Sequence, residues 1–275
     1  MSTSSALWAI PLVSLISGTS SPKIVNETYN QSSSYNSLIT HQDKPFVSNN
    51  NLLESIQPKY VIEFRSKPAN EWMIMVNNQP AFVVKNLPNA VIAAAKLAMT
   101  MNAPDFDPRY LEPLAIDGEY IGKYKNVILF KIPQSEVVNP SLKLTQWINN
   151  LRVSADVEPL TLVEAQKQMH QLAPTGEQIN GIASWYGPYF QGRQTASGEQ
   201  FEQQDFTAAH PSLPFDTYLK VTNQQNGKSV VVRINDRGPY FGDRNLDLSH
   251  AAAIALNSDE AGIVPIVATI LVSNN

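Results

Sequence analysis

The sequence predicts an α+β domain at residues 56–173, followed by a mainly-β barrel at residues 174–275. Three observations support this division. In the first region, short runs of β-branched and aromatic residues are mixed with stretches of helical spacing. In the second region, many short strand-like runs are joined by long loops, which is typical of a small barrel. Between the two regions, Ala173-Pro174-Thr175-Gly176 interrupts the preceding helical pattern.

The amino-terminal segment differs in composition from the rest of the chain. An apolar run from Ala6 to Ile16 is followed by small residues and is too short to span a bilayer comfortably. We interpret residues 1–20 as a signal peptide without basic residues before Lys23; the alternative is a disordered tail with an apolar patch. Residues 21–55 are rich in Asn, Ser and Gln, and we expect a disordered linker because they bury little apolar surface. The chain is therefore predicted to be exported.

The predicted α+β domain contains strands and helices in mixed order. Asn77-Asn78 is predicted to form a hairpin turn between two strands. Asp105 and Asp107 lie among prolines, and we interpret them as loop caps rather than as an active pair. The expected strands are Tyr60–Phe64, Trp72–Val76, Ala81–Val84 and Val127–Ile132, and the expected helices are Asn89–Met101, Ser141–Val153 and Pro159–Leu172. No catalytic constellation is recognisable in this domain, so its role stays open.

The predicted barrel is assembled from shorter elements. Asn226-Gly227 lies between two strand-like runs and is a strong hairpin signal. The expected strands are Gly181–Tyr186, Tyr218–Asn223, Ser229–Asn235 and Pro265–Val272, with a short helix at Ser249–Leu256.

The composition excludes several kinds of site and partner. The chain has no cysteine, which excludes disulfides, thiolate zinc sites, a cysteine nucleophile and a lipid-anchored cysteine. The histidines are too scattered to form a metal-ligand pattern, so neither a metal nor another cofactor is predicted. The formal net charge of −4 argues against nucleic acid as a partner, because duplex-binding domains usually present a basic face.

Four segments of the second region carry the strongest functional signal, and Asp247-Leu248-Ser249 follows them. The four segments are Ala183–Gly187, Gly192–Glu199, Thr207–His210 and Val232–Pro239. In this order and at these intervals they resemble the barrel of the rare lipoprotein A family, and more distantly the double-psi barrels of expansins and barwin-like proteins. The resemblance extends from Ile179 to Val272 and implies a six-stranded double-psi β-barrel.

The resemblance also implies an activity. Rare lipoprotein A proteins are septal lytic transglycosylases, lyases that cut peptidoglycan strands between N-acetylmuramic acid and N-acetylglucosamine and leave 1,6-anhydro ends. The family is associated with strands already stripped of peptide. It implies peptidoglycan strands as substrate, a periplasmic or wall-associated location, and the catalytic residues Glu199, His210 and Asp236. The family usually has glycine where Asp216 stands; Asp tolerates a left-handed backbone better than most residues do.

The chemistry of glycoside cleavage itself requires residues of these types. An acid must protonate the leaving oxygen, and the positive charge that grows at the anomeric carbon must be stabilised. The sugar's own C6 hydroxyl is the nucleophile of a transglycosylase, so one carboxyl can act first as acid and then as base. We assign this role to Asp236. Arg233 and Arg237 would oppose it, because a nearby cation favours the charged form of a carboxyl, and burial would have to outweigh them.

Each of these residues also has a purely structural interpretation. Asp236 could cap backbone amides or pair with Arg237, Glu199 could be a solvated turn residue, and His210 could cap the turn before Pro211. Within the motif we favour the functional interpretation of all three.

The second region is also rich in aromatic residues, whose faces suit the apolar face of a pyranose ring. We assign Tyr189 and Tyr240 to substrate binding, together with Arg233 and Arg237. One member of the pair Trp185 and Tyr186 is expected to face the barrel core, because side chains alternate along a strand.

Two rival functions stay open from the sequence. The first is a non-catalytic, expansin-like protein that binds wall glycan without cleaving it, and the second is a protease-inhibitor or interaction module. Peptidoglycan strands are the predicted partner, with cell-division or wall-associated proteins as further candidates, and we expect a monomer. The chain after the last predicted strand is too short for the SPOR domain that many relatives carry.

Overall fold

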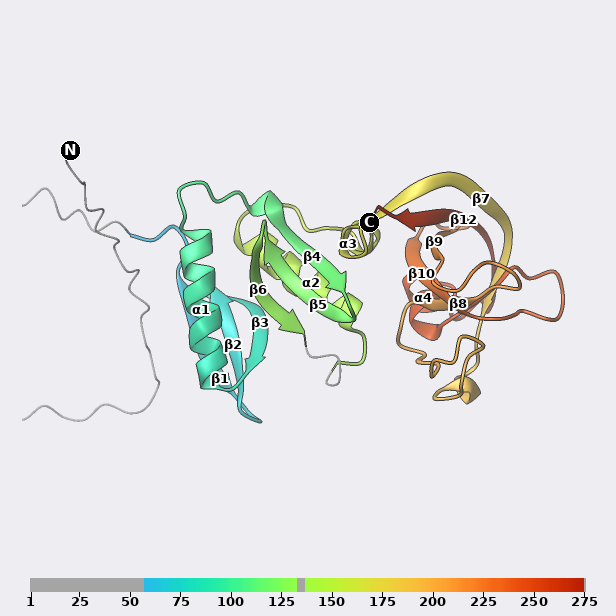
Figure 1. The fold of residues 1–275 in the computed structure, drawn as a ribbon, viewed down its shortest axis with the longest axis horizontal. Coiled ribbons are helices and arrows are strands. Elements are labelled where there is room, and N and C mark those ends of the chain that lie inside the picture. Colours follow the sequence, from blue (N-terminus) through green and yellow to red (C-terminus); the bar gives the residue numbers. More distant parts are fainter. Residues whose placement is uncertain (1–56, 133–136, 275) are drawn as a thin grey trace, which may run out of the picture.

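A computed structural model describes residues 57–132 and 137–274. The elements from β1 to α3 and those from β7 to β12 form two bodies that lie side by side along the longest axis of the molecule (Figure 1). We call them the amino-terminal region and the barrel. The predicted signal peptide and the whole of the predicted linker lie outside the described residues. No helix in the described part of the chain is long and apolar enough to cross a membrane.

The amino-terminal region begins with an antiparallel sheet of order β1-β2-β3, followed by helix α1. Asn77 and Asn78 connect β2 to β3 with positive φ angles of 48° and 65°, which confirms the predicted hairpin. The side chain of Asn86 caps α1 by accepting a hydrogen bond from the N–H of Asn89. The bounds are β1 Ile62–Lys67, β2 Glu71–Val76, β3 Gln79–Lys85 and α1 Leu87–Met101.

A second antiparallel sheet of order β4-β5-β6 follows a short 3-10 helix, η2. Strand β6 was predicted, whereas β4 and β5 were not. The Asp107 side chain caps η2 through the N–H of Arg109, and Asp105 pairs with Lys125 at 3.0 Å. The interpretation of Asp107 as a loop cap is thereby confirmed. The bounds are η2 Pro108–Tyr110, β4 Leu111–Ile116, β5 Glu119–Tyr124 and β6 Val127–Ile132.

Helices α2 (Pro140–Ser154) and α3 (Leu162–Met169) complete this region. One apolar core joins both sheets to α1 and α2, with Phe82, Phe130 and Trp147 in mutual ring contact. The expectation of a helix through Leu172 is wrong. The chain leaves the helix after Met169 and enters β7, because Leu172 and Ala173 pair with the last strand of the barrel.

The barrel is closed and has the strand order β10-β8-β11-β7-β12-β9. Its two parallel pairs are β10 with β8 and β11 with β7, and the remaining pairs are antiparallel. Side chains from all six strands and from α4 form its apolar core. The bounds are β7 Leu172–Trp185, β8 Thr207–Ala209, β9 Tyr218–Asn223, β10 Ser229–Asp236, β11 Leu246–Leu248, α4 His250–Ala255 and β12 Ile263–Ser273.

The four predicted barrel strands and the short helix are all present. The predicted six-stranded barrel is confirmed, although β8 and β11, each three residues long, were not predicted. The predicted breaker at Ala173–Gly176 lies inside β7, whose partner there is β12.

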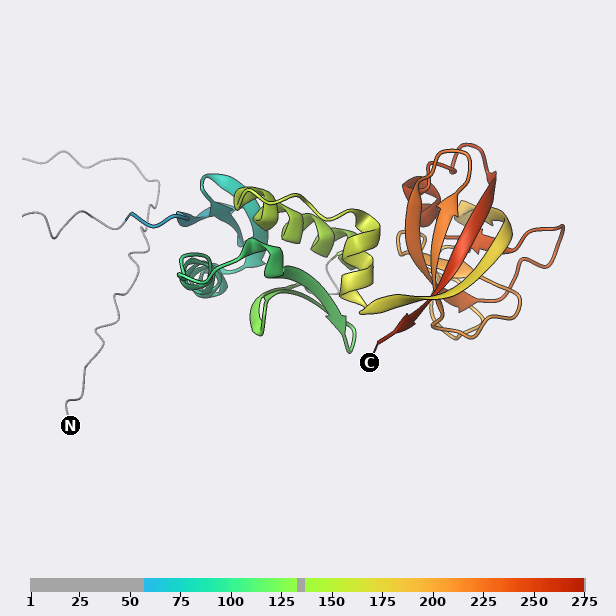
Figure 2. The ribbon, with the colours of Figure 1, turned by 90° about the horizontal axis from the view of Figure 1, so that it is seen from above.

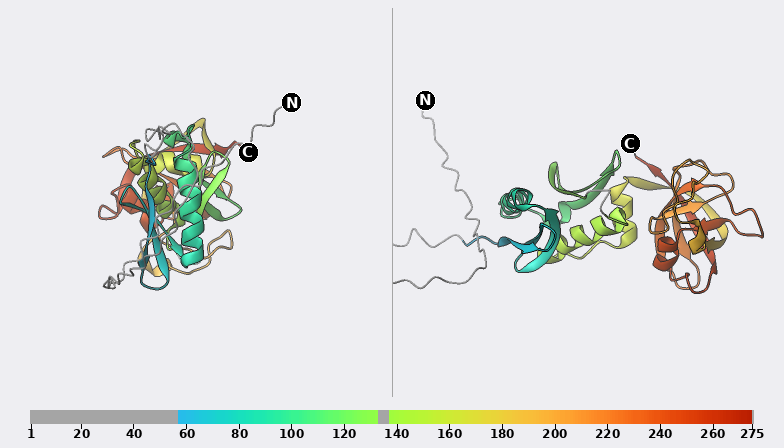
Figure 3. Two further views of the ribbon diagram at one scale, coloured as in Figure 1. Left: turned by 90° about the vertical axis from the view of Figure 1, so that its left-hand side faces the viewer. Right: turned by 90° about the horizontal axis from the view of Figure 1, so that it is seen from below.

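The two bodies meet at α3 and at the start of β7 (Figure 2). The side-chain amide of Gln166, on α3, donates to the carbonyl oxygen of Val231 and accepts from its N–H, both at 2.8 Å. Val231 is on β10, five positions before Asp236. The carboxy-terminal end of β12 returns to this junction (Figure 3), where the N–H of Asn274 donates to the carbonyl oxygen of Gln171 at 3.0 Å.

Candidate functional site

Asp236 ends β10, where the register of β10 against β8 shifts between Ile234 and Asp236. Its Oδ1 accepts hydrogen bonds from the backbone N–H groups of Ala196 and Arg237, both at 2.8 Å. Its Oδ2 accepts one from the hydroxyl of Tyr186 at 2.7 Å. The carboxyl group is therefore fixed in orientation, with Oδ1 held by the backbone and Oδ2 held by one side chain.

Both interpretations of Asp236 find support in this geometry. The side chain does cap backbone amides, as the structural interpretation expects. It makes no ion pair within the described residues, and the guanidinium of Arg237 instead donates to the carbonyl oxygen of Leu213 at 2.9 Å and lies over the ring of Phe215 at 3.8 Å. Arg237 is thus used to hold the loop after β8.

Tyr186 is the residue of this site that sequence reasoning missed. Its ring packs against Phe190 and Phe201, with ring centroids 5.3 and 4.8 Å apart. Burial and the hydrogen bond to Asp236 raise the pKa of Tyr186 well above its usual range, so the hydroxyl remains a donor to the carboxylate. The sequence signal that could have identified Tyr186 is its position next to Trp185 in the segment Ala183–Gly187.

Trp185 follows the expectation for one member of this pair. Its indole N–H donates to the carbonyl oxygen of Asp259 at 3.0 Å, and its ring stacks on His250. It packs against the barrel core. Consecutive side chains at the end of β7 point to opposite sides, so Trp185 faces the core and Tyr186, the next residue, faces Asp236.

Glu199 and Arg233 form the second cluster of the site. The Arg233 guanidinium contacts both oxygens of Glu199, at 2.7 and 2.8 Å, and also contacts Asp216 at 2.8 Å. Asn235 donates to Glu199 at 3.0 Å. The hydrogen bonds from Arg233, with a smaller contribution from Asn235, lower the pKa of Glu199. Glu199 is therefore held as a carboxylate, which suits charge stabilisation better than proton donation.

Asp216 adopts the backbone conformation expected of it. Its φ angle is 64°, in the left-handed region that Asp tolerates better than most residues. Its carboxylate adds the third member to the cluster with Glu199 and Arg233. The guanidinium of Arg233, which we assigned to substrate binding, is thereby engaged by two carboxylates.

His210 serves the turn that follows β8. Its Nδ1 accepts the N–H groups of Ser212 and Leu213 at 3.1 and 2.9 Å, so in the neutral ring the proton is on Nε2. Burial, with a smaller contribution from Arg237, lowers the pKa of His210. Its backbone N–H donates to the carbonyl oxygen of Asp236 at 3.2 Å. His210 therefore lies next to Asp236 along the backbone, while its ring acts as the turn cap.

The two tyrosines assigned to sugar stacking lie on loops of the barrel. Tyr189, in the 3-10 helix η4 (Pro188–Phe190), is 83% exposed, and Tyr240 is 76% exposed. The ring of Tyr240 lies next to Gly238, two residues after Asp236. Both rings are thus open to a ligand, and Tyr240 follows the carboxylate of Asp236 by four residues. No group of three acidic or histidine side chains in the described residues is arranged to hold a metal ion.

Residues 178–268 match the family model described as "Lytic transglycolase". The "Probable endolytic peptidoglycan transglycosylase RlpA" of Synechocystis sp. is 39% identical over an alignment of 211 residues, and the match covers 71% of this chain and 64% of that protein. The "Endolytic peptidoglycan transglycosylase RlpA" of Campylobacter jejuni is 37% identical over 135 residues, 49% of each chain. The barrel belongs to the rare lipoprotein A (RlpA) family.

Another RlpA relative matches a shorter stretch of the chain at higher identity. The "Endolytic peptidoglycan transglycosylase RlpA" of Pseudomonas aeruginosa is 55% identical over 82 residues, 30% of this chain and 24% of that protein. This chain spans less than two thirds of the length of each of these three relatives. The Synechocystis match covers more of this chain than the barrel supplies, so it includes residues of the preceding part.

Two solved structures resemble about a third of the chain. Apo expansin of Clavibacter michiganensis is 26% identical with a TM-score of 0.30, covering 36% of this chain and 52% of that one. A papain inhibitor of Streptomyces is 22% identical with a TM-score of 0.30, covering 34% of this chain and 94% of that one.

Proposed function

We propose that this chain is an endolytic lytic transglycosylase that cleaves peptidoglycan strands between N-acetylmuramic acid and N-acetylglucosamine. The membership of the barrel in the RlpA family is the observation that carries the proposal. We propose the periplasm or the cell wall as its location and a monomer as its working unit. The proposed division is a signal peptide at residues 1–20, a linker at 21–55, an α+β domain at 56–173 and the barrel at 174–275.

Asp236 is the proposed acid and base. In the first step its protonated carboxyl donates to the glycosidic oxygen, the bond from that oxygen to the anomeric carbon breaks, and positive charge develops on the muramic acid ring. In the second step the Asp236 carboxylate takes the proton of the C6 hydroxyl while that oxygen bonds to the anomeric carbon. The proton given to the leaving sugar is replaced by the proton of the C6 hydroxyl, so the carboxyl ends in its starting state and no water is consumed.

The neighbours of Asp236 have proposed supporting roles. The Tyr186 hydroxyl, 2.7 Å from Oδ2, orients the oxygen that exchanges the proton. The Glu199 carboxylate, fixed by Arg233 and Asn235, supplies negative charge that favours the developing cation. Tyr189 and Tyr240, exposed on loops, offer faces for sugar rings. His210, with its neutral ring, holds the turn beside Asp236.

Mass spectrometry of purified glycan strands after incubation with the full chain tests the proposal. We expect products with 1,6-anhydro ends, and we expect Asp236→Asn to lower their rate of formation by about 10²- to 10⁴-fold, because an acid-base group contributes on this scale. Circular dichroism and glycan pull-down of the variant control for folding and binding.

Other products would distinguish the rival functions. Hydrolysed reducing ends would indicate a muramidase instead of a transglycosylase. Glycan binding without products would support the expansin-like, non-catalytic function, and products that persist in Asp236→Asn would refute the role of this carboxyl.

A further inference from the structure

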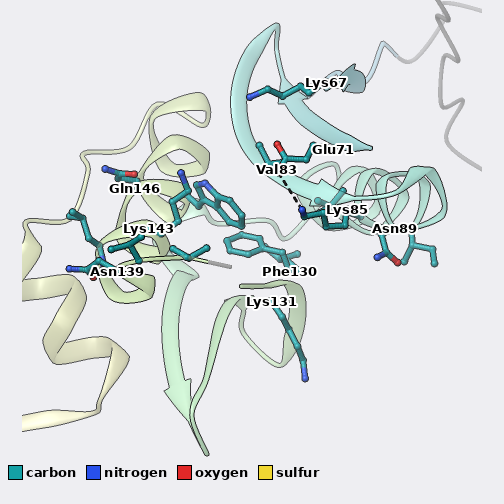
Figure 4. Close-up of a pocket in the computed structure, with 18 residues that line it drawn as sticks. Lys67, Glu71, Val83, Lys85, Asn89, Phe130, Lys131, Asn139, Lys143 and Gln146 are labelled. Atoms are coloured by element: carbon teal, nitrogen blue, oxygen red, sulfur yellow. Dashed lines mark hydrogen bonds and ion pairs between the residues drawn. The ribbon is translucent and has the colours of Figure 1, made fainter. Parts of the chain in front are cut away.

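The amino-terminal region contains a cavity of about 700 Å³, within the range typical of ligand sites. Strands β3 and β6 and helices α1 and α2 enclose it, together with the ends of β1 and β2 (Figure 4). It is remote in the fold from the candidate site, which lies on barrel loops (Figure 1). None of its lining residues belongs to the proposed catalytic machinery.

The floor and walls of this cavity are apolar. Phe130 and Trp147 form part of the floor and are almost fully buried, while Ile92 and Val138 on its walls are 58% and 67% exposed. Apolar side chains that line a hollow and remain open to solvent favour a ligand with methyl or methylene groups, because burying that surface is favourable.

The rim of the cavity carries an excess of positive charge. Lys67, Lys85, Lys131 and Lys143 line it, against a single acidic residue, Glu71. Lys85 pairs with Glu71 at 3.7 Å, and Lys131 pairs with Glu119, just outside the cavity, at 2.6 Å. Even when both glutamates are counted, the local balance is two positive charges, whereas the whole chain has a net charge of −4. The cavity is therefore complementary to an anion.

Two outer strands run along the cavity. Among the described residues, strand β3 is the last strand of one sheet and β6 is the last strand of the other, so each has one side without a strand partner there. Extended peptides commonly bind such strand edges through backbone hydrogen bonds. A ligand that combines an extended backbone, small apolar groups and carboxylates would meet all three features of the cavity.

We propose that this cavity binds the stem peptides of peptidoglycan. These peptides are short and extended, contain alanine methyl groups and carry several free carboxylates. The inference rests on the proposed function, because it takes peptidoglycan as the polymer on which the barrel acts. It assigns the amino-terminal region to strands that retain their peptides, whereas the family is associated with stripped strands. One chain then holds the wall at one point and cleaves it at another.

Isothermal titration calorimetry of the full chain with the tetrapeptide L-Ala-γ-D-Glu-meso-diaminopimelyl-D-Ala tests this proposal. We expect binding that weakens with added salt, and weaker binding of the same peptide with amidated carboxyl groups. The double variant Lys67→Glu/Lys143→Glu should bind the peptide at least about tenfold more weakly, because two attractive charges become repulsive. Lys143 lies in the first turns of α2, where Glu is well tolerated.

The matched control is Lys96→Glu/Lys228→Glu, which makes the same charge change at exposed lysines outside the cavity. It should bind the tetrapeptide within about twofold of the wild type. All three proteins should cleave peptide-free strands at the same rate, so loss of peptide binding and loss of cleavage are separate results.

Three results would overturn the assignment. One is that the wild type does not bind the tetrapeptide, and another is that the cavity variant binds it as well as the control does. The third is a preference for vesicles of anionic phospholipid, or for an acidic peptide of unrelated sequence, over the stem peptide.

Discussion

The candidate site of the barrel and the cavity of the amino-terminal region use their side chains in opposite ways. In the barrel, each oxygen of Asp236 and of Glu199 accepts at least one hydrogen bond from a named partner. In the cavity, the charged groups stand on a rim around an apolar floor, and Lys67 and Lys143 make no ion pair within the described residues.

This contrast corresponds to two different tasks. Proton transfer requires a carboxyl in one fixed position, so its neighbours are engaged in holding it. Capture of a flexible anionic peptide tolerates mobile lysine side chains, because a charge-charge attraction depends only weakly on angle. The predictions below test whether the two regions are as independent as this contrast implies.

The largest effect is expected at the junction between the regions. Gln166→Ala removes the two 2.8 Å hydrogen bonds to Val231 and leaves a buried backbone N–H and C=O of β10 unpaired. We expect it to lower the free energy of unfolding by about 2–4 kcal/mol. Urea unfolding followed by circular dichroism measures this change.

Gln168→Ala is the matched control, because Gln168 is exposed on the same helix. It should change the free energy of unfolding by less than about 0.5 kcal/mol. Equal effects of the two variants would mean that α3 does not support the barrel and that the two regions are independent.

A second prediction concerns the pH dependence of the junction. Burial, with a smaller contribution from Glu202, raises the pKa of Asp205 from 3.8 to about 6, so the fold favours its neutral form. The stability that this provides is present below about pH 4 and is lost as the pH rises through about 6. The Asp205→Asn variant does not lose this stability as the pH rises, because the asparagine side chain does not ionise.

The difference in unfolding free energy between Asp205→Asn and the wild type should therefore grow by on the order of 2 kcal/mol from pH 4 to pH 7. His170 lines the same small cavity as Asp205, and burial lowers its pKa to about 4. His170 therefore contributes to the pH dependence of stability with the opposite sign to Asp205. Both proteins contain His170, so its contribution cancels in the difference between their unfolding free energies. Urea unfolding at pH 4, 5, 6 and 7 measures the trend, and a constant difference would contradict it.

A smaller effect is expected in the barrel itself. Tyr186→Phe removes only the hydroxyl that orients Oδ2 of Asp236. If Tyr186 positions the proton-transferring oxygen, the rate of anhydro-product formation should fall by about tenfold, corresponding to one hydrogen bond to a charged group. KM should stay near the wild-type value, and the pH profile of kcat should shift. A fall in kcat/KM with kcat unchanged would instead place Tyr186 in glycan binding.

The smallest effect is expected at Asp216. Asp216→Gly relieves a positive φ angle of 64° but removes the contact with Arg233. Relief of a left-handed conformation contributes about 1 kcal/mol, and a largely exposed ion pair contributes a similar or smaller amount. Thermal unfolding should therefore change little. A large loss of stability would show that Asp216 is essential for fixing Arg233.

The elements that the sequence predicted well share strong local signals. Strand β9 was predicted at its observed bounds, since Tyr218–Asn223 alternates in burial and is followed by the Asn226-Gly227 turn. Strands β4 and β5 were missed because polar residues interrupt their apolar pattern, yet Asp117-Gly118 between them, with φ angles of 49° and 76°, is a hairpin signal of the same kind. Strands β8 and β11 are too short for any periodicity to be visible.

The candidate site was predictable where a motif placed residues next to one another. The proximity of Arg233, Asn235 and Asp236 follows from their order on one strand. The pairing of Glu199 with Arg233 and of Tyr186 with Asp236 depends on how β7, β10 and their loops close the barrel. Such contacts between distant segments have no signature in a single sequence.

The long pairing of β7 with β12 has a mechanical consequence. It begins at Leu172 and Ser273, directly at the junction, and continues along β7 as far as Ser184, paired with Ile263. A pulling force between the two regions would act along these strands and would have to shear many backbone hydrogen bonds together, rather than open them one after another. The joint is therefore stiff under tension, which suits a protein proposed to bind the cell wall through one region and to cleave it with the other.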